Sequence, residues 1–332
     1  MGRCSFGAGD SREATLLCPC TQTQAVLHRQ TGHSLQKMTG LARLWQRIQR
    51  WVVRTDKQRS ARHAGQADAR YPDCSSSGPD RRGTMNLSGI SNKSLLGRLL
   101  RLPLRLIPPR TVVRILQGSL RGKKWIASSS SHGCWLGNYE YVKRILFERT
   151  VRENGVVFDV GAHVGFYTLL ASVLVGSRGS VFAFEPFPAN LLYLKEHLRL
   201  NNIDNVTVVE AAVSENTGTA FFSEGPSSST GHISPNGRLE VETVAIDELV
   251  AKKDLPVPDY IKMDIEGAEA SALSGAKSTL AQFHPTIFLA THGSSIHQEC
   301  CRLLWALDYE LQPIDGTNLE TSDEILATYN TG

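Results

Sequence analysis

The stretch VVFDVGAHVGFYT, residues 156–168, begins with four apolar residues in five, continues through a Gly-x-x-x-Gly turn and ends in a second apolar run. The first five residues are typical of a buried strand, and the residues from Gly165 to about Val175 are typical of a helix. Glycines at positions 161 and 165 let the backbone turn sharply and approach a ligand closely. The stretch therefore predicts a strand, a tight turn and a helix, with a binding site at the turn.

The same alternation of strands and helices continues along the sequence. Further strands are expected at 181–185, 206–210, 260–265, 286–290 and 309–314, a short strand pair near 219–223 and 239–244, and helices at 188–201, 267–282 and 297–307. Alternating strands and helices imply a parallel sheet covered by helices on both faces. Continuously apolar strands are typical of such a sheet. The predicted fold class is α/β, a doubly wound and mostly parallel sheet.

The charge distribution divides the sequence into a basic arm and an acidic body. Residues 1–110 carry 19 Lys and Arg against 6 Asp and Glu, whereas residues 111–332 carry 17 against 26. Residues 1–84 are rich in Ser, Gln, Arg and Gly and predict a basic, disordered N-terminal extension. Residues 85–150 are expected to form a helical and strand segment that leads into the domain, and residues 151–332 the ligand-binding domain itself.

Two segments of the basic arm, residues 40–54 and 95–110, combine apolar side chains with Arg at helical spacing. They indicate peripheral contact with a membrane surface. For the first segment, the alternative is an incidental pattern in an unfolded tail, and for the second it is packing on the domain. The sequence has no run of about 18 apolar residues, no signal peptide and no C-x-x-C pair among its seven cysteines, which predicts a reducing, cytoplasmic location. It also lacks an aromatic-basic RNA motif, so no nucleic-acid partner is expected.

Carboxylates follow or end four of the predicted strands. They are Asp159, Glu185, Glu210 and Asp264. In open parallel sheets, ligands bind outside the carboxyl ends of the strands. Because these ends meet along one edge of the sheet, we expect the four carboxylates to lie where a ligand binds.

The turn after the first strand does not suit a ligand with phosphates. A dinucleotide site requires G-x-G-x-x-G, but His163 and Phe166 occupy the second and third glycine positions, and Asp159 adds a negative charge. A P-loop is excluded as well, because no G-K-[ST] follows. S-adenosylmethionine fits the turn better, since it carries a sulfonium, an ammonium, a ribose and an adenine but no phosphate.

Each part of S-adenosylmethionine has an expected partner. Asp159, beside the Gly161–Gly165 turn, could accept a hydrogen bond from the ammonium, and Glu185 could accept both ribose hydroxyls. Glu210 and Ala211 are expected near the adenine. The alternative is an ordinary strand-to-helix turn with Glu185 as a cap, but the residues taken together favour the ligand.

Four segments, FDVGAHVGFYTLLAS, VFAFEPFPANLLYLKEHLRLNNIDNVTVVEAAVS, AIDEL and IKMDIEGAEASALSGAKSTL, resemble the FkbM-type family of S-adenosylmethionine-dependent methyltransferases. The resemblance covers about residues 120–330. It implies a Rossmann-like class I methyltransferase with a seven-stranded sheet and a terminal antiparallel strand, and mostly O-methylation of hydroxyls on natural products and sugars. The segment WLGNYE, which ends at Glu140, matches a family segment before the first strand and implies a cover over the cofactor.

The chain departs from the family pattern at two positions. The family usually has Asn at the position of His163, and an acidic residue is common after the fifth strand, where this chain has the run Leu289-Ala290-Thr291-His292. The leading hypothesis is an S-adenosylmethionine-dependent O-methyltransferase acting on a hydroxyl of a small molecule, sugar or glycan. An N-methyltransferase and a catalytically degenerate cofactor-binding or interaction module are the alternatives. The sequence makes no prediction of the oligomeric state.

Methyl transfer to a hydroxyl needs a base within hydrogen-bond reach of its proton. Side chains alternate along a strand, so Lys262 and Asp264 share a face, which Glu266 joins if the chain stays extended; Glu266 could instead lie in the first turn of the next helix. Asp264 is the first candidate for contact with the methionine moiety or the acceptor, and His292 is a candidate general base. His292 and His297 have no evident third ligand, so no metal is expected. The acceptor is expected among loops 122–140, 224–237 and 291–296.

Overall fold

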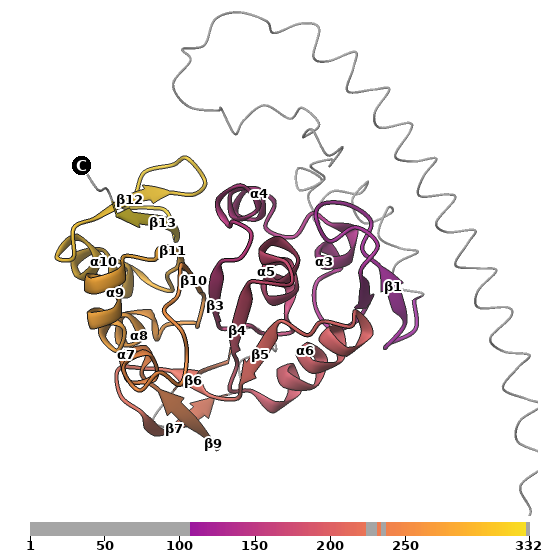
Figure 1. Ribbon diagram of the computed structural model, residues 1–332, viewed down its shortest axis with the longest axis horizontal. Coiled ribbons are helices and arrows are strands. Elements are labelled where there is room, and N and C mark those ends of the chain that lie inside the picture. The colour runs from indigo at the N-terminus through magenta and orange to yellow at the C-terminus, as the bar shows by residue number, and fades with distance from the viewer. Residues whose placement is uncertain (1–106, 224–230, 234–236, 330–332) are drawn as a thin grey trace, which may run out of the picture. The chain divides into compact units, whose positions relative to one another are not determined.

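The computed structural model describes residues 107–223, 231–233 and 237–329 (Figure 1). Several expectations fall outside these residues. They are the N-terminal extension at 1–84, the basic helix at 40–54, nearly all of the segment at 95–110 and most of the loop at 224–237. Within the described part of the chain, no helix has the length and apolar character needed to cross a membrane.

Seven strands of the described chain form one sheet, in the order β12-β13-β11-β10-β3-β4-β5. Their bounds are β3 Val156–Val160, β4 Ser180–Phe184, β5 Val206–Val209, β10 Tyr260–Met263, β11 Thr286–Ala290, β12 Tyr309–Pro313 and β13 Glu324–Tyr329. The strands from β11 to β5 pair in parallel, and β13 is antiparallel to both of its neighbours. The predicted fold class, a doubly wound and mostly parallel sheet with a terminal antiparallel strand, is confirmed.

Strand β13 is the element of this sheet that the strand pattern does not predict. It inserts between β11 and β12, so that Ala327 pairs with Ile287 on one side and with Leu311 on the other. Only Ile325 and Ala327 of the strand are fully buried. Its apolar run, Ile325 to Ala327, is only three residues long and is bounded by Glu324 and Thr328, so the strand gives a weaker signal than the longer apolar runs of the parallel strands.

Helices cover both faces of the sheet (Figure 1). Val157 of β3 belongs to a core with α4 and α5, whereas its neighbour Phe158 belongs to a second core with α7 to α10. This opposite placement follows from the alternation of side chains along a strand. The helix bounds are α4 Tyr141–Thr150, α5 Phe166–Val175, α6 Pro188–Leu200, α7 Ile246–Ala251, α8 Glu269–Ser274, α9 Lys277–Phe283 and α10 Ser294–Trp305.

The helix expected at 267–282 is wrong as one element, because it is divided into α8 and α9 at Gly275. A Cβ atom at Gly275 would overlap the carbonyl oxygen of Ser214, so the chain passes very close to the segment after β6 there. Asp247 holds the break: its backbone N–H donates to the Gly275 carbonyl (2.8 Å), and its carboxylate accepts from the backbone N–H groups of Ser278 and Thr279 at 2.8 and 2.7 Å. The carboxylate therefore satisfies free N–H groups at the start of α9.

Two smaller pieces flank the main sheet. A four-stranded sheet between β5 and β10 in the sequence has the order β6-β9-β7-β8, with β6 Ala212–Val213, β7 Gly218–Ser223, β8 His232–Ile233 and β9 Leu239–Val244. Before α4, a hairpin of β1 Val112–Arg114 and β2 Lys124–Ile126 precedes the short helix α3 His132–Leu136.

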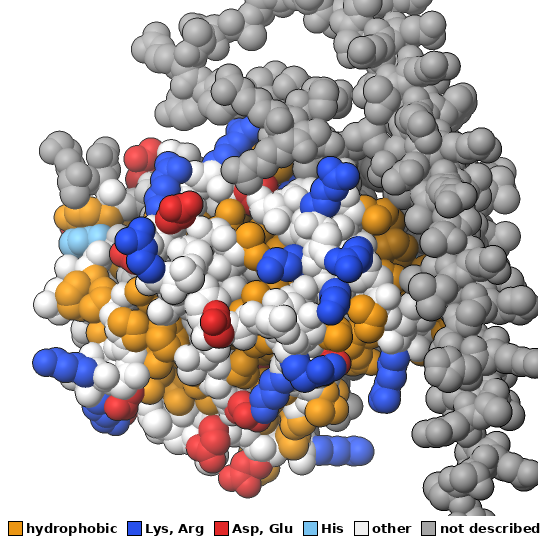
Figure 2. Space-filling model, turned by 45° about the vertical axis from the view of Figure 1, so that its right-hand side comes forward, with side chains coloured by type: hydrophobic (Ala, Val, Ile, Leu, Met, Phe, Trp, Pro, Cys, Tyr) orange, Lys and Arg blue, Asp and Glu red, His pale blue; other side chains and the backbone are white. Residues whose placement is uncertain are grey.

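On the face shown in Figure 2, acidic and basic side chains are interspersed with apolar ones, as on an ordinary solvated surface.

The turn after β3 brings two strand ends together. Gly161 has φ 76°, and a Cβ atom there would overlap the backbone carbonyl oxygen of Asp264, just past β10. The backbone N–H groups of Gly161 and Ala162 donate to the carbonyl oxygen of Phe184, at the end of β4, at 3.0 and 2.9 Å. Only glycine permits this close approach, so the Gly161 turn fixes the ends of β3, β4 and β10 against one another.

Candidate active site

Two cavities lie at the carboxyl edge of the main sheet. The first lies between the ends of β3 and β4 and the small sheet, and the second extends toward α3 and the end of β11. The second has a volume of about 280 Å³ and the first of about 60 Å³. Four residues line both, namely Gly161, His163, Asp264 and Glu266. The two cavities therefore adjoin at the predicted turn, and a ligand could extend from one into the other.

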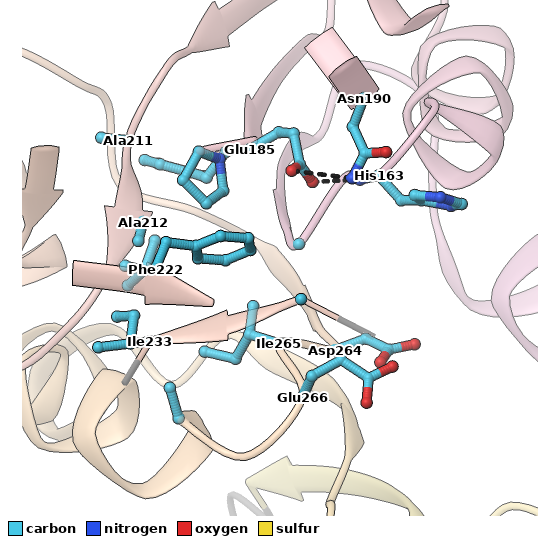
Figure 3. Close-up of a pocket in the computed structure, with 16 residues that line it drawn as sticks. His163, Glu185, Asn190, Ala211, Ala212, Phe222, Ile233, Asp264, Ile265 and Glu266 are labelled. Atoms are coloured by element: carbon cyan, nitrogen blue, oxygen red, sulfur yellow. Dashed lines mark hydrogen bonds between the residues drawn. The ribbon is translucent and has the colours of Figure 1, made fainter. Parts of the chain in front are cut away.

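Glu185 lies on the wall of the first cavity in a fixed orientation (Figure 3). One carboxylate oxygen accepts from the backbone N–H of His163 at 2.7 Å, and the other accepts from the backbone N–H of Phe187 at 2.9 Å and from the Asn190 amide at 3.1 Å. Only 4% of the residue is exposed, and this burial raises the pKa of the carboxyl group. Because Oε1 already accepts two hydrogen bonds and Oε2 only one, Glu185 can still accept a ligand hydroxyl at Oε2.

His163, which has φ 50°, lines both cavities, and its ring is directed away from the first one (Figure 3). Burial, together with the nearby charge of Lys262, lowers the pKa of its imidazole to about 4. The ring is therefore neutral at physiological pH. A neutral imidazole can both donate and accept hydrogen bonds. His163 can therefore make the same two kinds of hydrogen bond as an Asn amide at this position.

Lys262 fixes the Gly161 turn through a hydrogen bond and an ion pair. Its ammonium donates to the carbonyl oxygen of Gly161 at 2.8 Å and lies 3.3 Å from a carboxylate oxygen of Asp159. The other oxygen of Asp159 accepts from the Thr168 hydroxyl at 2.6 Å. Asp159 is fully buried and lines neither cavity, whereas Lys262 lines the second. The buried ammonium of Lys262, paired with Asp159, therefore lies next to the Gly161 turn.

A second buried lysine joins three carboxylates that sequence reasoning did not connect. The Lys143 ammonium lies 2.9 Å from Glu140, 2.8 Å from Glu324 and 3.5 Å from Asp264, and its side chain is 1% exposed. Burial alone would lower the pKa of Lys143, but the surrounding carboxylates raise it above its usual value. Lys143 therefore stays charged and ties α4 to the ends of β10 and β13.

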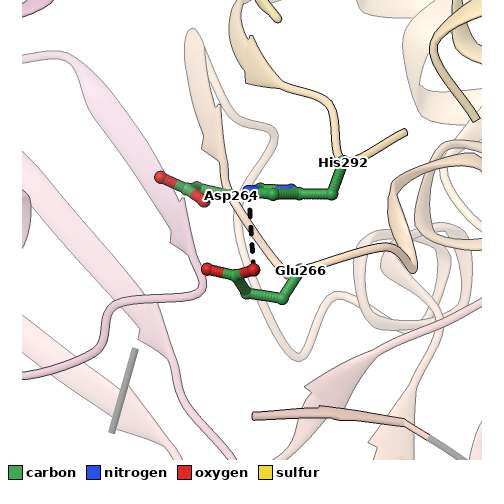
Figure 4. A group of neighbouring side chains, drawn as sticks. All are labelled: Asp264, Glu266 and His292. Atoms are coloured by element: carbon green, nitrogen blue, oxygen red, sulfur yellow. Dashed lines mark ion pairs between the residues drawn. The ribbon is translucent and has the colours of Figure 1, made fainter. Parts of the chain in front are cut away.

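His292, which follows β11, lies among three carboxylates, two of which, Asp264 and Glu266, are drawn in Figure 4. Its Nδ1 lies 2.8 Å from an oxygen of Glu269, and its Nε2 lies 3.7 Å from Asp264 and 3.6 Å from Glu266. The hydrogen bond with Glu269, against the opposing effect of burial, raises the pKa of His292 to about 9. His297 lies elsewhere, with its ring nitrogens near the Thr291 hydroxyl and the Cys301 sulfur.

Most of the predicted site residues meet at these cavities. Those on a cavity wall are Glu140, Gly161, His163, Glu185, Ala211, Lys262, Asp264, Glu266 and His292. Asp159, Gly165 and Glu210 are on neither wall. Gly165, with φ 90°, begins α5 and packs against Leu194, while Glu210 is exposed and paired with Lys195 at 2.6 Å.

Lys143, Asn190, Glu269 and Glu324 are residues of the site that the sequence analysis did not assign to it. Glu269 is visible in the sequence as an acid in the first turn of a helix, which by itself indicates only a favourable interaction with the helix dipole. Lys143 lies in a predicted helix with no signal for burial, and Glu324 lies in the unpredicted strand β13. Only the fold places these four side chains beside the cavities.

The comparisons with known proteins agree with this geometry. Residues 159–311 match the family model described as the methyltransferase FkbM domain. The hexuronic acid methyltransferase AglP of Haloferax volcanii is 31% identical over 145 residues, which are 42% of this chain and 56% of that protein. The 2-O-methyltransferase NoeI of Sinorhizobium fredii is 24% identical over 163 residues, which are 42% of this chain and 65% of that protein.

The matches thus span less than two thirds of the length of either curated relative. Among solved structures, the methyltransferase FkbM of Methylobacillus flagellatus aligns with a TM-score of 0.39 at 25% identity, over 53% of this chain and 43% of that one. An O-methyltransferase of Thermotoga maritima aligns with a TM-score of 0.40 at 16% identity, over 68% and 79% of the two chains.

Proposed function

Because residues 159–311 match the family model of the methyltransferase FkbM domain, we propose that this protein methylates a hydroxyl group of a sugar, glycan or other small molecule with S-adenosylmethionine as the donor. One observation carries the proposal. The cavity that contains Glu185 and the cavity that contains Glu140, Asp264 and His292 adjoin at the Gly161 turn. A donor in the first and an acceptor in the second would meet there.

The residues of the first cavity fit an adenosyl group. Oε2 of Glu185 offers a fixed acceptor for a ribose hydroxyl, and Ala211 and Ile265 offer apolar surface to an adenine. Phe222 projects into this cavity (Figure 3), so a bound nucleoside requires its ring to shift. When bound, S-adenosylmethionine supplies a methyl group on a positively charged sulfur, which the nearby carboxylates of Asp264 and Glu140 favour electrostatically.

The second cavity fits a hydroxylated acceptor. Its wall carries hydrogen-bonding side chains from four separate segments, including Ser130, Glu140, Thr291 and Glu324. Carboxylates accept hydrogen bonds from sugar hydroxyls, and fixed partners on several sides hold one hydroxyl in line with the donor. Such alignment lowers the activation free energy of a reaction between two bound molecules by up to about 7–11 kcal/mol. The names of both curated relatives, a hexuronic acid methyltransferase and a 2-O-methyltransferase, support a sugar.

We test the donor first by calorimetric titration of the full chain with S-adenosylmethionine, S-adenosylhomocysteine and NAD. Both adenosyl compounds are expected to bind and NAD is not. Glu185→Gln is expected to weaken adenosyl binding about 10- to 150-fold, because a hydrogen bond to a charged group contributes about 1.5–3 kcal/mol. Glu196→Gln, an exposed carboxylate paired with Arg199, is the matched control. A folded protein that binds neither adenosyl compound contradicts the proposal.

The acceptor is tested with radiolabelled S-adenosylmethionine and a panel of hexoses, hexuronic acids and oligosaccharides, read by mass of the product. A mass gain of one methyl group on a hydroxyl supports O-methylation. Adenosyl binding without transfer to any hydroxyl of the panel would instead support an interaction module, and transfer to an amine would support N-methylation.

We also infer a cytoplasmic location with peripheral membrane contact through residues 40–54 and 95–110. The free cysteines Cys134, Cys300 and Cys301 are compatible with a reducing compartment. Cosedimentation of the full chain with vesicles of anionic lipid, compared with neutral lipid, tests the contact. Equal recovery of the protein in the supernatant with both lipids contradicts it.

A further inference from the structure

We propose that Asp264, Glu266 and His292 form a binding site for one divalent transition-metal cation at the junction of the two cavities. The three side chains come from two neighbouring strand ends, β10 and β11, and Figure 4 shows them directed toward one another. The sequence analysis named these three residues as candidates for the reaction but expected no metal, because the ligands are distributed over 29 positions in the pattern D-x-E and a distant His.

The spacing of the donor atoms suits one ion. The Nε2 atom of His292 lies 3.7 Å from Oδ1 of Asp264 and 3.6 Å from Oε2 of Glu266, and all three donors lie within 4.8 Å of one another. Donor atoms held about 2.1 Å from a shared ion lie about 3.0–3.6 Å apart at ordinary bond angles. The three side chains therefore need only small rotations to surround an ion.

Glu269 holds the imidazole as an outer partner of a metal-bound histidine does. Its Oε1 lies 2.8 Å from Nδ1 of His292 and also accepts from the backbone N–H groups of Ile265 and Gly267 at 3.3 and 3.1 Å. A carboxylate on the far ring nitrogen fixes the orientation of a ligating histidine and leaves the other nitrogen free for the metal. Glu269 is itself fully buried, so this orientation is rigid.

The second oxygen of Glu269 gives independent support. It is buried and has no hydrogen-bond partner among the described residues. A buried carboxylate that is incompletely hydrogen-bonded is costly unless positive charge lies nearby. A cation bound to the other nitrogen of His292 would supply such charge through the imidazole.

The surrounding charges permit a cation. Lys143 is the positive group closest to the site, but it contacts Oδ2 of Asp264, at 3.5 Å, and leaves Oδ1 for the ion. Lys143 is balanced by Glu140 and Glu324, and Lys262 is paired with Asp159. Neither Lys143 nor Lys262 alone therefore neutralises the negative charges of Asp264, Glu266 and Glu269.

One imidazole and two carboxylates favour Mn²⁺, Co²⁺ or Zn²⁺ over the oxygen-seeking Mg²⁺ and Ca²⁺. Three protein ligands leave coordination positions open toward the second cavity. If the proposed methyl transfer is right, an acceptor hydroxyl would occupy such a position, and the ion would lower its pKa and so ease loss of its proton. This last role rests on the proposed function, whereas the cation site itself does not.

The test uses the full chain, freed of metal with a chelator, and MnCl₂ alone. We expect calorimetry and the electron paramagnetic resonance signal of free Mn²⁺ to report one site per chain. Glu266→Gln is expected to weaken Mn²⁺ binding at least 10-fold, as is His292→Gln, which serves in its place if the first variant does not fold. Glu242→Gln, which removes an exposed carboxylate of β9, is the matched control and should leave binding unchanged.

Absence of Mn²⁺ binding by the folded protein overturns the proposal, and so does binding that both site variants leave unchanged. Because binding is measured without S-adenosylmethionine, the two proposals fail separately. Methyl transfer that proceeds unchanged in excess chelator would refute the role of the ion in the reaction, whereas the Mn²⁺ titration decides on the site itself. Mn²⁺ binding at this site by a protein that methylates nothing would refute the proposed function alone.

Discussion

His197 on α6 makes the stability of this domain depend on pH in a way that can be worked out from its contacts. The ring is fully buried, and its Nε2 accepts from the backbone N–H of Ile126, in β2, at 3.1 Å. Its Nδ1 lies 2.7 Å from the carbonyl oxygen of Val164, in the turn before α5, and the ring stacks on Trp125 at 3.8 Å. Protonation of Nε2 would place a second donor against the Ile126 N–H.

Burial, against the opposing effect of the Val164 carbonyl, lowers the pKa of His197 from 6.5 to about 4. Between these values the unfolded chain binds the proton and the folded chain does not, so stability is complete above about pH 7 and falls as the pH decreases toward 4. For each proton that the unfolded chain binds in excess of the folded chain, the free energy of unfolding falls by about 1.4 kcal/mol per unit decrease in pH. The expected loss from His197 between pH 7.5 and pH 5 is therefore about 2 kcal/mol.

The assay is urea unfolding, followed by tryptophan fluorescence at both pH values, for the wild type and for His197→Gln. The variant is less stable at pH 7.5, but it has no titrating group at this position. Because all other groups cancel in the comparison, the difference in free energy of unfolding between the two proteins should shrink by about 2 kcal/mol at pH 5. A difference that stays constant with pH would refute the reasoning.

Two further predictions concern the support of the site. Gly161→Ala should destabilise the domain by about 2–4 kcal/mol, through positive φ and overlap with the Asp264 carbonyl. Gly316→Ala, with φ 72° and no atom within 4 Å of the added Cβ, should cost about 1–2 kcal/mol; equal losses in urea unfolding would contradict the role of the overlap. Lys143→Met should destabilise by about 3–5 kcal/mol, since it leaves three partly buried carboxylates without their shared ammonium, whereas the exposed Lys252→Met should have little effect; a small loss for Lys143→Met would contradict its place in the network.

The parts of the fold that were predictable are those with a strong local signal. The strands at 156–160 and 286–290 have the expected bounds, because four of the five residues in each are apolar. The break at Gly275 depends on the Ser214 carbonyl and on Asp247, which are far away in the sequence. Helical periodicity extends across that position and contains no information about either contact.

The same distinction holds for the site. The carboxylates at strand ends are visible in the sequence because topology alone brings strand ends to one edge, and Glu185 and Asp264 do line the cavities there. Glu210 shares the pattern but turns to the surface and pairs with Lys195. The surroundings of His292 were not predictable, because they require Glu269 to turn back from α8 and the end of β11 to lie beside that of β10.

The position of β13 has a consequence for how the protein is made. This strand fills the gap between β11 and β12, and its first residue, Glu324, binds the buried Lys143. During synthesis, β12 has no partner in the main sheet and Lys143 lacks one of its carboxylates until residues 324–329 have left the ribosome. The nascent chain therefore carries an open sheet edge, which is prone to pairing with other chains, and it acquires a complete second cavity only after residues 324–329 have been added.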